Sequence, residues 1–428
     1  MLTKKRHTPL RASLAVCMPV AGLFCAGVAH ADAAPGAQRQ ITPAGTIITP
    51  SSSQPKPAGI AHTNIKIFLP RGRHARDAAP GGKFETPASL ACVYGLTARV
   101  IGCNPETLTT VATTGAKLIA LVDAYDDPTA ANDLGVYSRQ FGLPAITADN
   151  FQVVYGGKKK PAQDASGGWE LEESLDIEMA HALAPNAKIV LVEAESSSIR
   201  DLLAAEKVAT ELVEAAGGGE VSNSWGGAEG KGEKVFEKYF AGTNVVYFAS
   251  SGDSPGPAFP SVLPNVVAVG GTTLNRTPSG TLKSQTTWST NGGGRSAYIA
   301  TPHYQSAVTT IVGTQRGAPD LAAVGNPASG PWVYDTTPYS ENGTPTVLDW
   351  LVIGGTSVAS PAVAAMVNSA ASFRASSTAE LTALYAELGK KKAFTYVTGS
   401  CVNASGGQAL AGYNLCAGIG APVGPAGL

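Results

Sequence analysis

Apolar runs alternate with amphipathic stretches along most of this chain. The runs "KLIALVDAY" (117–125) and "KIVLVEA" (188–194) are almost continuously apolar, and each precedes a stretch with helical spacing. Further strand candidates are "EVSNSW" (220–225), "NVVYFASSGD" (244–253) and "VVAVGGTTL" (266–274). Strands that are apolar on both faces and alternate with helices predict a mostly parallel, doubly wound α/β sheet with helices on both faces.

The predicted helices and strand ends already suggest where a site would lie. "DDPTAANDLGVYSRQFG" (126–142) and "SSIRDLLAAEKVATELVEAAGGG" (197–219) read as helices, the second ended by glycines. In such folds ligands bind beyond the carboxyl ends of the strands. The polar or aromatic residues found at those ends include Asp123, Trp225 and Asp253.

The N-terminal 84 residues have a different pattern. A basic segment, an apolar run over residues 12–28 and an Ala-His-Ala tripeptide predict a secretory signal peptide at residues 1–31. A membrane anchor is the weaker alternative, because the run is short and ends in small residues. Residues 32–84 are rich in Pro, Gly and Ser and indicate a linker or a short pro-segment, and residues 85–428 form one globular domain. We therefore expect a secreted protein, extracellular or periplasmic, with no membrane contact after signal removal.

Cysteine usage and charge narrow the picture further. Outside the signal, Cys92, Cys103, Cys401 and Cys416 form two close pairs, which predicts the disulfides 92–103 and 401–416 in an oxidising compartment. Zinc binding is disfavoured, because neither pair has C-x-x-C spacing or a neighbouring histidine. The net charge of −1 gives no electrostatic reason to expect nucleic acid as a partner.

A candidate nucleophile lies in "IGGTSVASPAVAAMVNSAASF" (353–373). Ser357 follows two glycines and Thr356 and begins a predicted helix of small residues. Small neighbours let a substrate backbone approach, and a helix N-terminus favours developing negative charge. The alternative is that Ser357 only caps the helix.

A serine nucleophile needs a base, and the histidines do not supply an obvious one. Only His181 and His303 lie in the globular part, and neither has a supporting sequence context. A carboxylate base is therefore favoured over histidine.

The acidic stretch "GGWELEESLDIEMAHALAP" (167–185) offers that carboxylate. On a helix, Glu172 and Asp176 share one face beside an apolar stripe. A partly buried pair of this kind shares a proton, which raises one pKa. We expect the other three acidic side chains to be solvated surface charges: Glu170, Glu173 and Glu178.

Asp253 is a third candidate carboxylate. It follows a strand within "ASSGDSPG" (249–256), in a predicted tight turn. The alternative is an aspartate that bonds only to its own turn. If protonated, Asp253 can donate a hydrogen bond to an oxyanion.

Together, "ELEESLDIEMAHALAPNAKIVLVEA", "VSNSWGG", "ASSGDS" and "GGTSVASPAVAA" resemble the sedolisin family of serine-carboxyl peptidases. The resemblance covers about residues 85–428 and implies a subtilisin-like fold and an acid endopeptidase with a Ser-Glu-Asp triad. It assigns Ser357 as nucleophile, Glu172 as base, Asp176 as its orienting partner and Asp253 as the oxyanion aspartate. Asp123 falls where subtilisins have their triad aspartate, and the resemblance leaves it a structural role.

The resemblance also places the segment that pairs with substrate backbone at Ser224, Trp225 and Gly226. Its calcium site should lie near the C-terminus, but Tyr396 and Asn414 occupy the positions of the expected carboxylates. Because Ca²⁺ prefers charged oxygen ligands, we expect no metal, no cofactor, and a disulfide 401–416 in place of the ion.

Two further departures concern activation and the oxyanion turn. Residues 32–84 are too short for the family's folded pro-domain, and Pro255 stands where a glycine is common. The predicted function is an exported endopeptidase, a monomer that acts on proteins or peptides, with an acidic optimum. The alternatives are a neutral histidine-dependent protease and a non-catalytic peptide-binding module.

Overall fold

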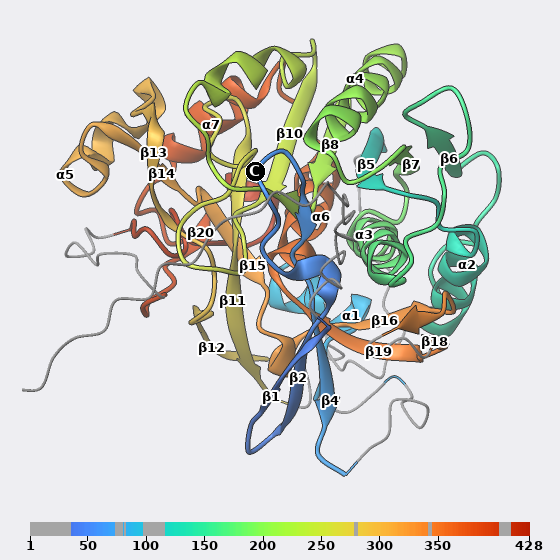
Figure 1. The fold of residues 1–428 in the computed structure, drawn as a ribbon. Helices are drawn as coiled ribbons and strands as arrows, with labels where there is room; N and C mark the ends of the chain where they lie inside the picture. The colour runs from blue at the N-terminus through green and yellow to red at the C-terminus, as the bar shows by residue number, and fades with distance from the viewer. Residues whose placement is uncertain are drawn as a thin grey trace, which may run out of the picture. The chain divides into compact units, whose positions relative to one another are not determined.

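A parallel sheet forms the centre of the chain (Figure 1). The computed structural model describes residues 36–72, 80, 83–96, 116–277, 281–340, 345–401 and 412–428. Within them, eight strands form one sheet in the order β12-β11-β10-β8-β5-β7-β6, with β15 beside β11. All its pairings are parallel except β11 with β12. The strands are β5 (Leu118–Ala124), β6 (Phe151–Tyr155), β7 (Lys188–Ala194), β8 (Gly219–Asn223), β10 (Val245–Ser250), β11 (Val267–Arg276), β12 (Leu282–Thr287) and β15 (Leu321–Val324).

Helices cover both faces of this sheet, as the sequence predicts. Alternate residues of β5 enter different cores: Ile119 and Leu121 join one, Ala120 and Val122 the other. The first core includes side chains of α2 (Ala130–Phe141), α3 (Gly168–Leu183) and α6 (Thr356–Ala370). The second includes side chains of α4 (Ile199–Ala215). Fully apolar strands are therefore explained by burial on two sides, and the predicted α/β fold is confirmed.

The acidic helix α3 corrects one prediction. All sixteen of its residues are buried, so the expectation that Glu170, Glu173 and Glu178 are solvated is wrong. The face of α3 turned away from the sheet is covered by other parts of the chain. Glu178 accepts the N–H of Tyr334 in β16 (Trp332–Asp335) at 3.0 Å, and Glu170 accepts the N–H of Asp164 at 2.6 Å. The spacing of residues along the helix cannot show that segments distant in the sequence cover its other face.

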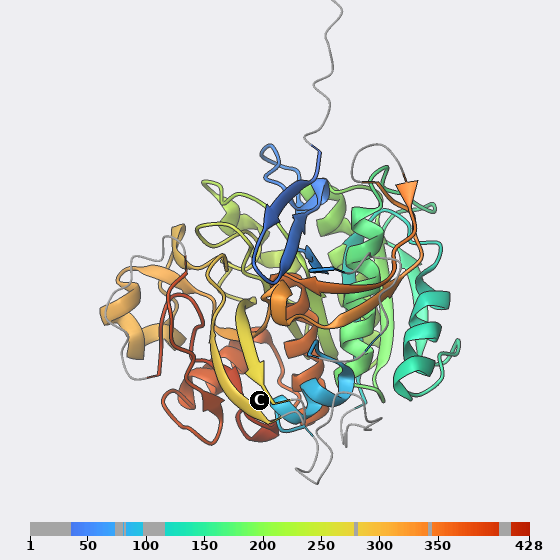
Figure 2. The same ribbon diagram turned by 90° about the horizontal axis from the view of Figure 1, so that it is seen from below.

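The N-terminal residues build part of a second sheet (Figure 2). Its order is β1-β2-β4-β19-β16 and its pairings are antiparallel. Four of these strands are β1 (Gln38–Ile41), β2 (Gly45–Thr49), β4 (Lys66–Pro70) and β19 (Asp349–Gly354). In addition, β3 (His62–Thr63) pairs with β9 (Trp225–Gly226). A linker therefore does not describe residues 36–72; the pro-segment remains a prediction, and the signal peptide lies outside the described residues.

The remaining elements are short. They are the helices α1 (Pro87–Val93), α5 (Thr309–Val312) and α7 (Ser377–Ala386), and the strands β13 (Gly294–Ala300), β14 (Gln315–Ala318), β17 (Tyr339–Ser340), β18 (Pro345–Thr346), β20 (Phe394–Thr395) and β21 (Ala421–Pro422). The 3-10 helices are η1 (Ser51–Ser53), η3 (Glu233–Tyr239), η4 (His303–Val308), η5 (Pro327–Ser329) and η6 (Pro425–Gly427).

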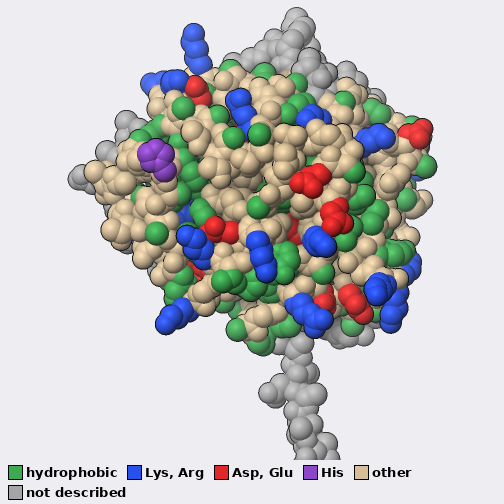
Figure 3. All heavy atoms as spheres, turned by 90° about the horizontal axis from the view of Figure 1, so that it is seen from above, with side chains coloured by type: hydrophobic (Ala, Val, Ile, Leu, Met, Phe, Trp, Pro, Cys, Tyr) green, Lys and Arg blue, Asp and Glu red, His purple; other side chains and the backbone are tan. Residues whose placement is uncertain are grey.

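The described cysteines and the molecular surface can be compared with the predictions made from the sequence. Cys401 and Cys416 form the predicted disulfide, whereas the proposed partner of Cys92, Cys103, lies outside the described residues. On the face shown in Figure 3, basic and acidic side chains are interspersed among apolar and small ones. No helix in the described part of the chain is long and apolar enough to cross a membrane.

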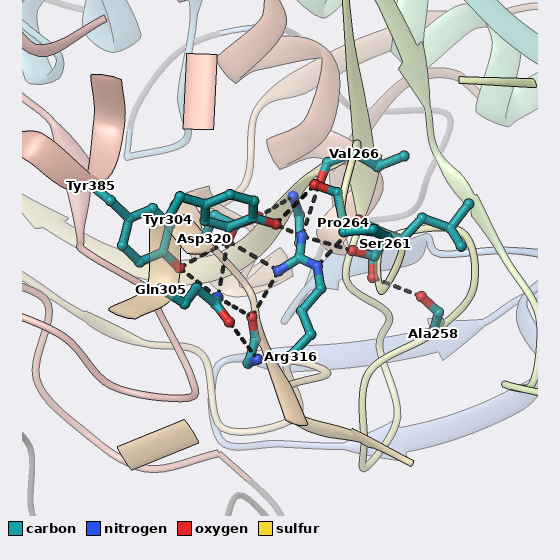
Figure 4. A network of polar contacts seen from close by, with 12 residues as sticks. Ala258, Ser261, Pro264, Val266, Tyr304, Gln305, Arg316, Asp320 and Tyr385 are labelled. Carbon is teal, nitrogen blue, oxygen red and sulfur yellow. Dashed lines mark hydrogen bonds and ion pairs between the residues drawn. The ribbon is translucent and has the colours of Figure 1, made fainter. Parts of the chain in front are cut away.

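A buried arginine organises the chain that follows Asp253 (Figure 4). Arg316 and Asp320 are both fully buried and form an ion pair at 2.8 Å. The same guanidinium donates to the carbonyls of Ser261, Leu263 and Val266. Ser261 in turn donates from its hydroxyl to the carbonyl of Ala258 at 2.7 Å. Because the guanidinium and carboxylate satisfy each other and several backbone groups, the pair offsets its own desolvation and holds residues 258–266 in one conformation.

Candidate active site

Ser357 lies in the first turn of α6, directly after β19. The helix N-cap is Gly355, so the interpretation of Ser357 as a cap is wrong. Gly355 has a φ of +115°, and a Cβ there would clash with the carbonyl oxygen of Asn64 and stand 2.9 Å from Asp253 Oδ2. Ser357 is fully buried, and its Oγ donates to the carbonyl of Ser224 at 2.9 Å. Only glycine at 355 allows a peptide carbonyl to approach the nucleophile this closely.

Glu172 and Ser357 meet at one backbone N–H. The amide of Asn64 lies 3.3 Å from Glu172 Oε2 and 3.2 Å from Ser357 Oγ, and it donates to both. Burial raises the pKa of Glu172 well above its usual value, the nearby Asp123 charge raises it further, and a hydrogen bond with Ser357 opposes both. The α3 side chain predicted as the base thus lies beside the predicted nucleophile.

Asp176 and Asp123 complete a group of buried carboxyls with Glu172. Asp176 accepts a hydrogen bond from Ser224 Oγ at 2.7 Å. Its pKa is raised well above the usual value by burial and then by the charges of Asp123 and Glu172. Burial raises the pKa of Asp123 to about 8. None of the ion pairs formed by the described residues involves these three carboxyls, so no paired cation offsets the desolvation that raises their pKa values.

Asp253 follows the end of β10 and contacts Thr356, the residue before the nucleophile. Its Oδ1 accepts the N–H of Thr356 at 2.8 Å and the Thr356 hydroxyl at 3.0 Å. The carboxyl therefore bonds a distant segment, which excludes the view of a simple turn aspartate. Its Oδ2 is buried and has no partner among the described residues. Burial raises the pKa of Asp253 to about 6, against the opposing charge of Lys66.

The carbonyl of Ser224 accepts the Ser357 hydroxyl, and Trp225 and Gly226 of β9 form one side of the groove that the chain's own residues 60–63 occupy. Trp225 and Gly226 pair with Thr63 and His62 of the chain's own N-terminal part. The predicted substrate-binding strand is thus engaged with an extended segment of the same chain. The sequence prediction missed the groove residue Asn64, because residues 32–84 looked like a linker and no local signal marks a segment that fills a distant groove.

The two candidate histidines lie away from this arrangement. A ring nitrogen of His181 lies 3.1 Å from the carbonyl oxygen of Pro144, and His303 begins η4. In the described part of the chain, the hydroxyl of Ser357 has hydrogen bonds with Ser224, Asn64 and Glu172, and none with either histidine.

In the region where the family's calcium would bind, the side-chain amide of Asn414 already has hydrogen-bond partners. Asn414 Oδ1 accepts the N–H groups of Cys416 and Ala417, both at 2.9 Å, and Asn414 Nδ2 donates to the carbonyl of Val397. The described residues contain no group of three His, Cys, Asp or Glu side chains that could hold a metal. The amide of Asn414 thus braces the loop beside the disulfide, and the loss of the calcium site stays a prediction.

Comparisons with known proteins agree with this fold and point to one group of enzymes. The model of the subtilase family matches residues 153–387. Kumamolisin of Bacillus sp. (strain MN-32) is 29% identical over 279 residues, covering 58% of this chain and 47% of the relative. Sedolisin of Pseudomonas sp. (strain 101) is 24% identical over 289 residues, covering 56% and 47%. The chain spans about half the length of these curated relatives.

A solved structure supports the same fold. Pseudomonas sedolisin complexed with two molecules of pseudo-iodotyrostatin superposes with a TM-score of 0.59 at 21% identity, covering 81% of this chain and 96% of that one. At this identity the likeness concerns the fold. With the two curated relatives, it confirms the sedolisin resemblance found in the sequence.

The buried carboxyls predict that the protein is more stable in acid. An unfolded glutamate titrates near pH 4.3, while burial raises the pKa of Glu178 well above its usual value, a hydrogen bond from Tyr334 opposing this change. Between those two pKa values the folded state binds more protons, so stability falls as pH rises from about 4 through the folded-state pKa. Each tenfold difference in proton affinity between the folded and unfolded states corresponds to about 1.4 kcal/mol. We expect the melting temperature, followed by circular dichroism, to fall by several degrees between pH 4 and 8.

Glu178→Gln should make that pH dependence shallower, since glutamine still accepts the Tyr334 N–H but does not ionise. Glu211→Gln is the matched control, because Glu211 is a solvent-exposed side chain paired with Lys207. Equal slopes for both variants, or a melting temperature that rises with pH, would contradict this account of α3.

Proposed function

This chain belongs to the subtilase family, and we propose that it is an exported serine-carboxyl endopeptidase that works best in acid. The observation that supports this most directly is the convergence of Ser357, Glu172 and Asp253 around the backbone of Asn64. Ser357 N–H donates to the carbonyl of Asn64 at 3.3 Å, while Glu172 lies beside the amide of the same residue. A hydroxyl, a buried carboxyl and two candidate oxyanion donors around a peptide carbonyl suit acyl transfer.

The proposed reaction has two steps. Glu172, as carboxylate, takes the proton of Ser357 Oγ while Oγ attacks the peptide carbonyl carbon. The negative charge on the carbonyl oxygen is stabilised by the Ser357 N–H and by the proton on Asp253 Oδ2. Glu172 then gives its proton to the leaving nitrogen, the C–N bond breaks, and an acyl-enzyme remains. Water attacks the ester with Glu172 again as base, which releases the second product and restores Ser357.

Asp176 and Asp123 have a positioning role in this proposal. The Ser224 hydroxyl links Asp176 to the loop that accepts the Ser357 hydroxyl, because Ser224 Oγ donates to Asp176 and the Ser224 carbonyl accepts from Ser357. The neighbouring carboxyls of Asp123, Glu172 and Asp176 titrate together, so a single negative charge is shared among the three. Glu172 can then be a carboxylate while its neighbours stay neutral.

Export and independence from calcium complete the proposal. The disulfide between Cys401 and Cys416 suits an oxidising compartment, and the N-terminal pattern is that of a secretory signal. Closing the 15-residue loop stabilises the chain by about 3 kcal/mol in the chain-entropy model. We propose that this bond and the Asn414 hydrogen bonds take over the structural task of the family's ion.

Removing either the nucleophile or the base should abolish turnover. We expect Ser357→Ala and Glu172→Gln each to lower the hydrolysis of denatured casein, assayed from pH 2 to 8, by at least about 10³-fold. The change from a carboxylate to an amide keeps the shape of residue 172 but removes the basic oxygen.

Histidine variants provide the control for this assay. His181→Gln and His303→Ala should retain most of the wild-type turnover, since neither ring contacts Ser357. Loss of activity in either would favour a histidine-dependent protease. Equal turnover of wild type, Ser357→Ala and Glu172→Gln would refute the proposed chemistry.

Loss of the Asp253 proton should set the highest pH at which the enzyme is active. Its pKa of about 6 means that the proton on Oδ2 is lost as pH rises through that value, and the oxyanion donor with it. Asp253→Asn keeps an acceptor for Thr356 and supplies a permanent N–H donor, so its activity should persist to higher pH than that of the wild type. Asp253→Ala should lose about 10²–10³-fold in kcat at every pH. Identical pH profiles for wild type and Asp253→Asn would contradict this role.

Chelation should leave the enzyme unaffected. We expect casein hydrolysis and melting temperature to be the same in EDTA and in added Ca²⁺, whereas the double variant Cys401→Ser, Cys416→Ser should melt at a lower temperature. Activity lost in EDTA and regained with Ca²⁺ would show that the disulfide has not replaced the ion.

A further inference from the structure

A segment of the chain itself lies in the groove at Ser357 in the manner of a bound peptide. Residues 60–63 are extended and lie between two other stretches of the chain. Ala61 N–H donates to the carbonyl of Ser197 at 2.7 Å, and Ile199 N–H donates to the carbonyl of Gly59 at 2.9 Å. On the other side, His62 and Thr63 pair antiparallel with β9. The segment is therefore the middle strand of three, which is how strand addition holds a peptide.

The strand presents one particular bond to the nucleophile. The carbonyl of Asn64 accepts the Ser357 N–H at 3.3 Å. Its oxygen and Asp253 Oδ2 both lie within 3 Å of the point where a Cβ of Gly355 would stand. The carbonyl that faces the proposed oxyanion donors is thus that of Asn64, and the bond on offer is Asn64–Ile65.

The side chain of Asn64 fills a small pocket lined by hydrogen-bond acceptors. Asn64 is fully buried, and its Nδ2 donates to Ser250 Oγ at 2.8 Å and to the Ser224 carbonyl at 3.4 Å. The wall is Gly226, where a Cβ would lie 3.3 Å from Asn64 Nδ2 and 3.1 Å from the Cβ of Ala258. Ala258 is held through the Ser261 and Arg316 hydrogen bonds shown in Figure 4, so the wall is rigid.

A second side chain of the segment is also enclosed. Ala61, three residues before Asn64, is fully buried within the core that includes α4 side chains. His62 between them is half-buried. A larger side chain at the position of Ala61 would have to displace packed core atoms.

We infer, on the basis of the proposed function, that this groove selects peptides with asparagine before the cleaved bond and a small apolar residue three positions earlier. The pocket requires an N–H donor, because the Ser224 carbonyl can only accept. Leucine has a similar size but leaves Ser250 Oγ without its amide donor, and an ionised aspartate offers no donor at all. Glutamine is longer by one methylene and meets the wall at Gly226 and Ala258. Discrimination by unpaired buried polar groups is stronger than discrimination by size alone.

Hydrogen bonds with η1 hold the chain on both sides of the Asn64–Ile65 bond, so a free substrate must compete with this segment. Ile65 N–H donates to Ser53 Oγ at 3.2 Å, and the hydroxyls of Ser52 and Ser53 lie 2.9 and 2.6 Å from the hydroxyl of Thr63. The residues on both sides of the bond are therefore braced by η1. Peptides supplied from outside have to displace this segment, so the assay needs them in large excess.

The test uses the full chain and the octapeptides Ile-Ala-His-Thr-X-Ile-Lys-Ile, with X as Asn, Leu, Asp or Gln. Casein hydrolysis gives the working pH, and mass spectrometry identifies the bond cleaved. We expect cleavage after X, with kcat/KM for Asn at least about 10-fold above that for each other peptide. Replacing the peptide's Ala by Phe should reduce kcat/KM by a similar factor.

Two variants connect the preference to the pocket. Ser250→Ala should lower the ratio of kcat/KM for the Asn and Leu peptides by at least about threefold. Asn64→Leu weakens the hold of the chain's own segment, so it should speed cleavage of the Asn peptide.

The outcomes separate this inference from the proposed function. Casein hydrolysis with no preference for Asn over Leu, or cleavage at another bond, overturns the inference and leaves the peptidase intact. An unchanged Asn-to-Leu ratio in Ser250→Ala also overturns it. If the wild-type chain cleaves neither casein nor any peptide at any pH from 2 to 8, the proposed function fails and the inference with it.

Discussion

The rest of this structure depends on carboxyl groups buried without a cationic partner. Asp123, Glu172 and Asp176 come from β5 and α3 and meet in the interior, where desolvation disfavours their charged forms. Burial also raises the pKa of Glu173 and of Glu178 on the same helix. Carboxyls whose pKa is raised in this way bind protons on folding, so we expect low pH to favour the folded state. The same protons are those the proposed chemistry uses, so stability and catalysis favour the same conditions.

The groove and the nucleophile are parts of one continuous arrangement. β4 follows Asn64 and pairs with β19, and β19 leads directly to Gly355 and Ser357. The segment that fills the groove is therefore tied by hydrogen bonds to the strand that positions the nucleophile. On the opposite side, Arg316 fixes the loop that forms the pocket wall. These two supports hold the carbonyl of Asn64 against the Ser357 N–H and near Asp253.

Much of the fold was predictable because its signals are local. The strand β7 occupies the very residues predicted from its apolar run, and α4 begins at a serine N-cap and ends before three glycines. The positions of Ser357 and Asp253 were also predictable, since a glycine-rich approach to a helix and a tight turn after a strand are short patterns. The segment before residue 85 was not, because its strands β1, β2 and β4 join the rest of the sheet only where β4 pairs with β19, almost 300 residues away.

By itself, the sequence determined the order of strands and helices, the likeness to sedolisins and which side chains are chemically able to act. Tertiary structure decided which of the acidic residues on α3 are buried, because a helix pattern shows one apolar stripe but not what covers the other side. It also decided that Asp123 joins Glu172 and Asp176, and that Asn64 fills the groove. Those facts rest on hydrogen bonds and packing between segments 108 to 293 residues apart, and such contacts leave no periodicity in the sequence from which they could be predicted.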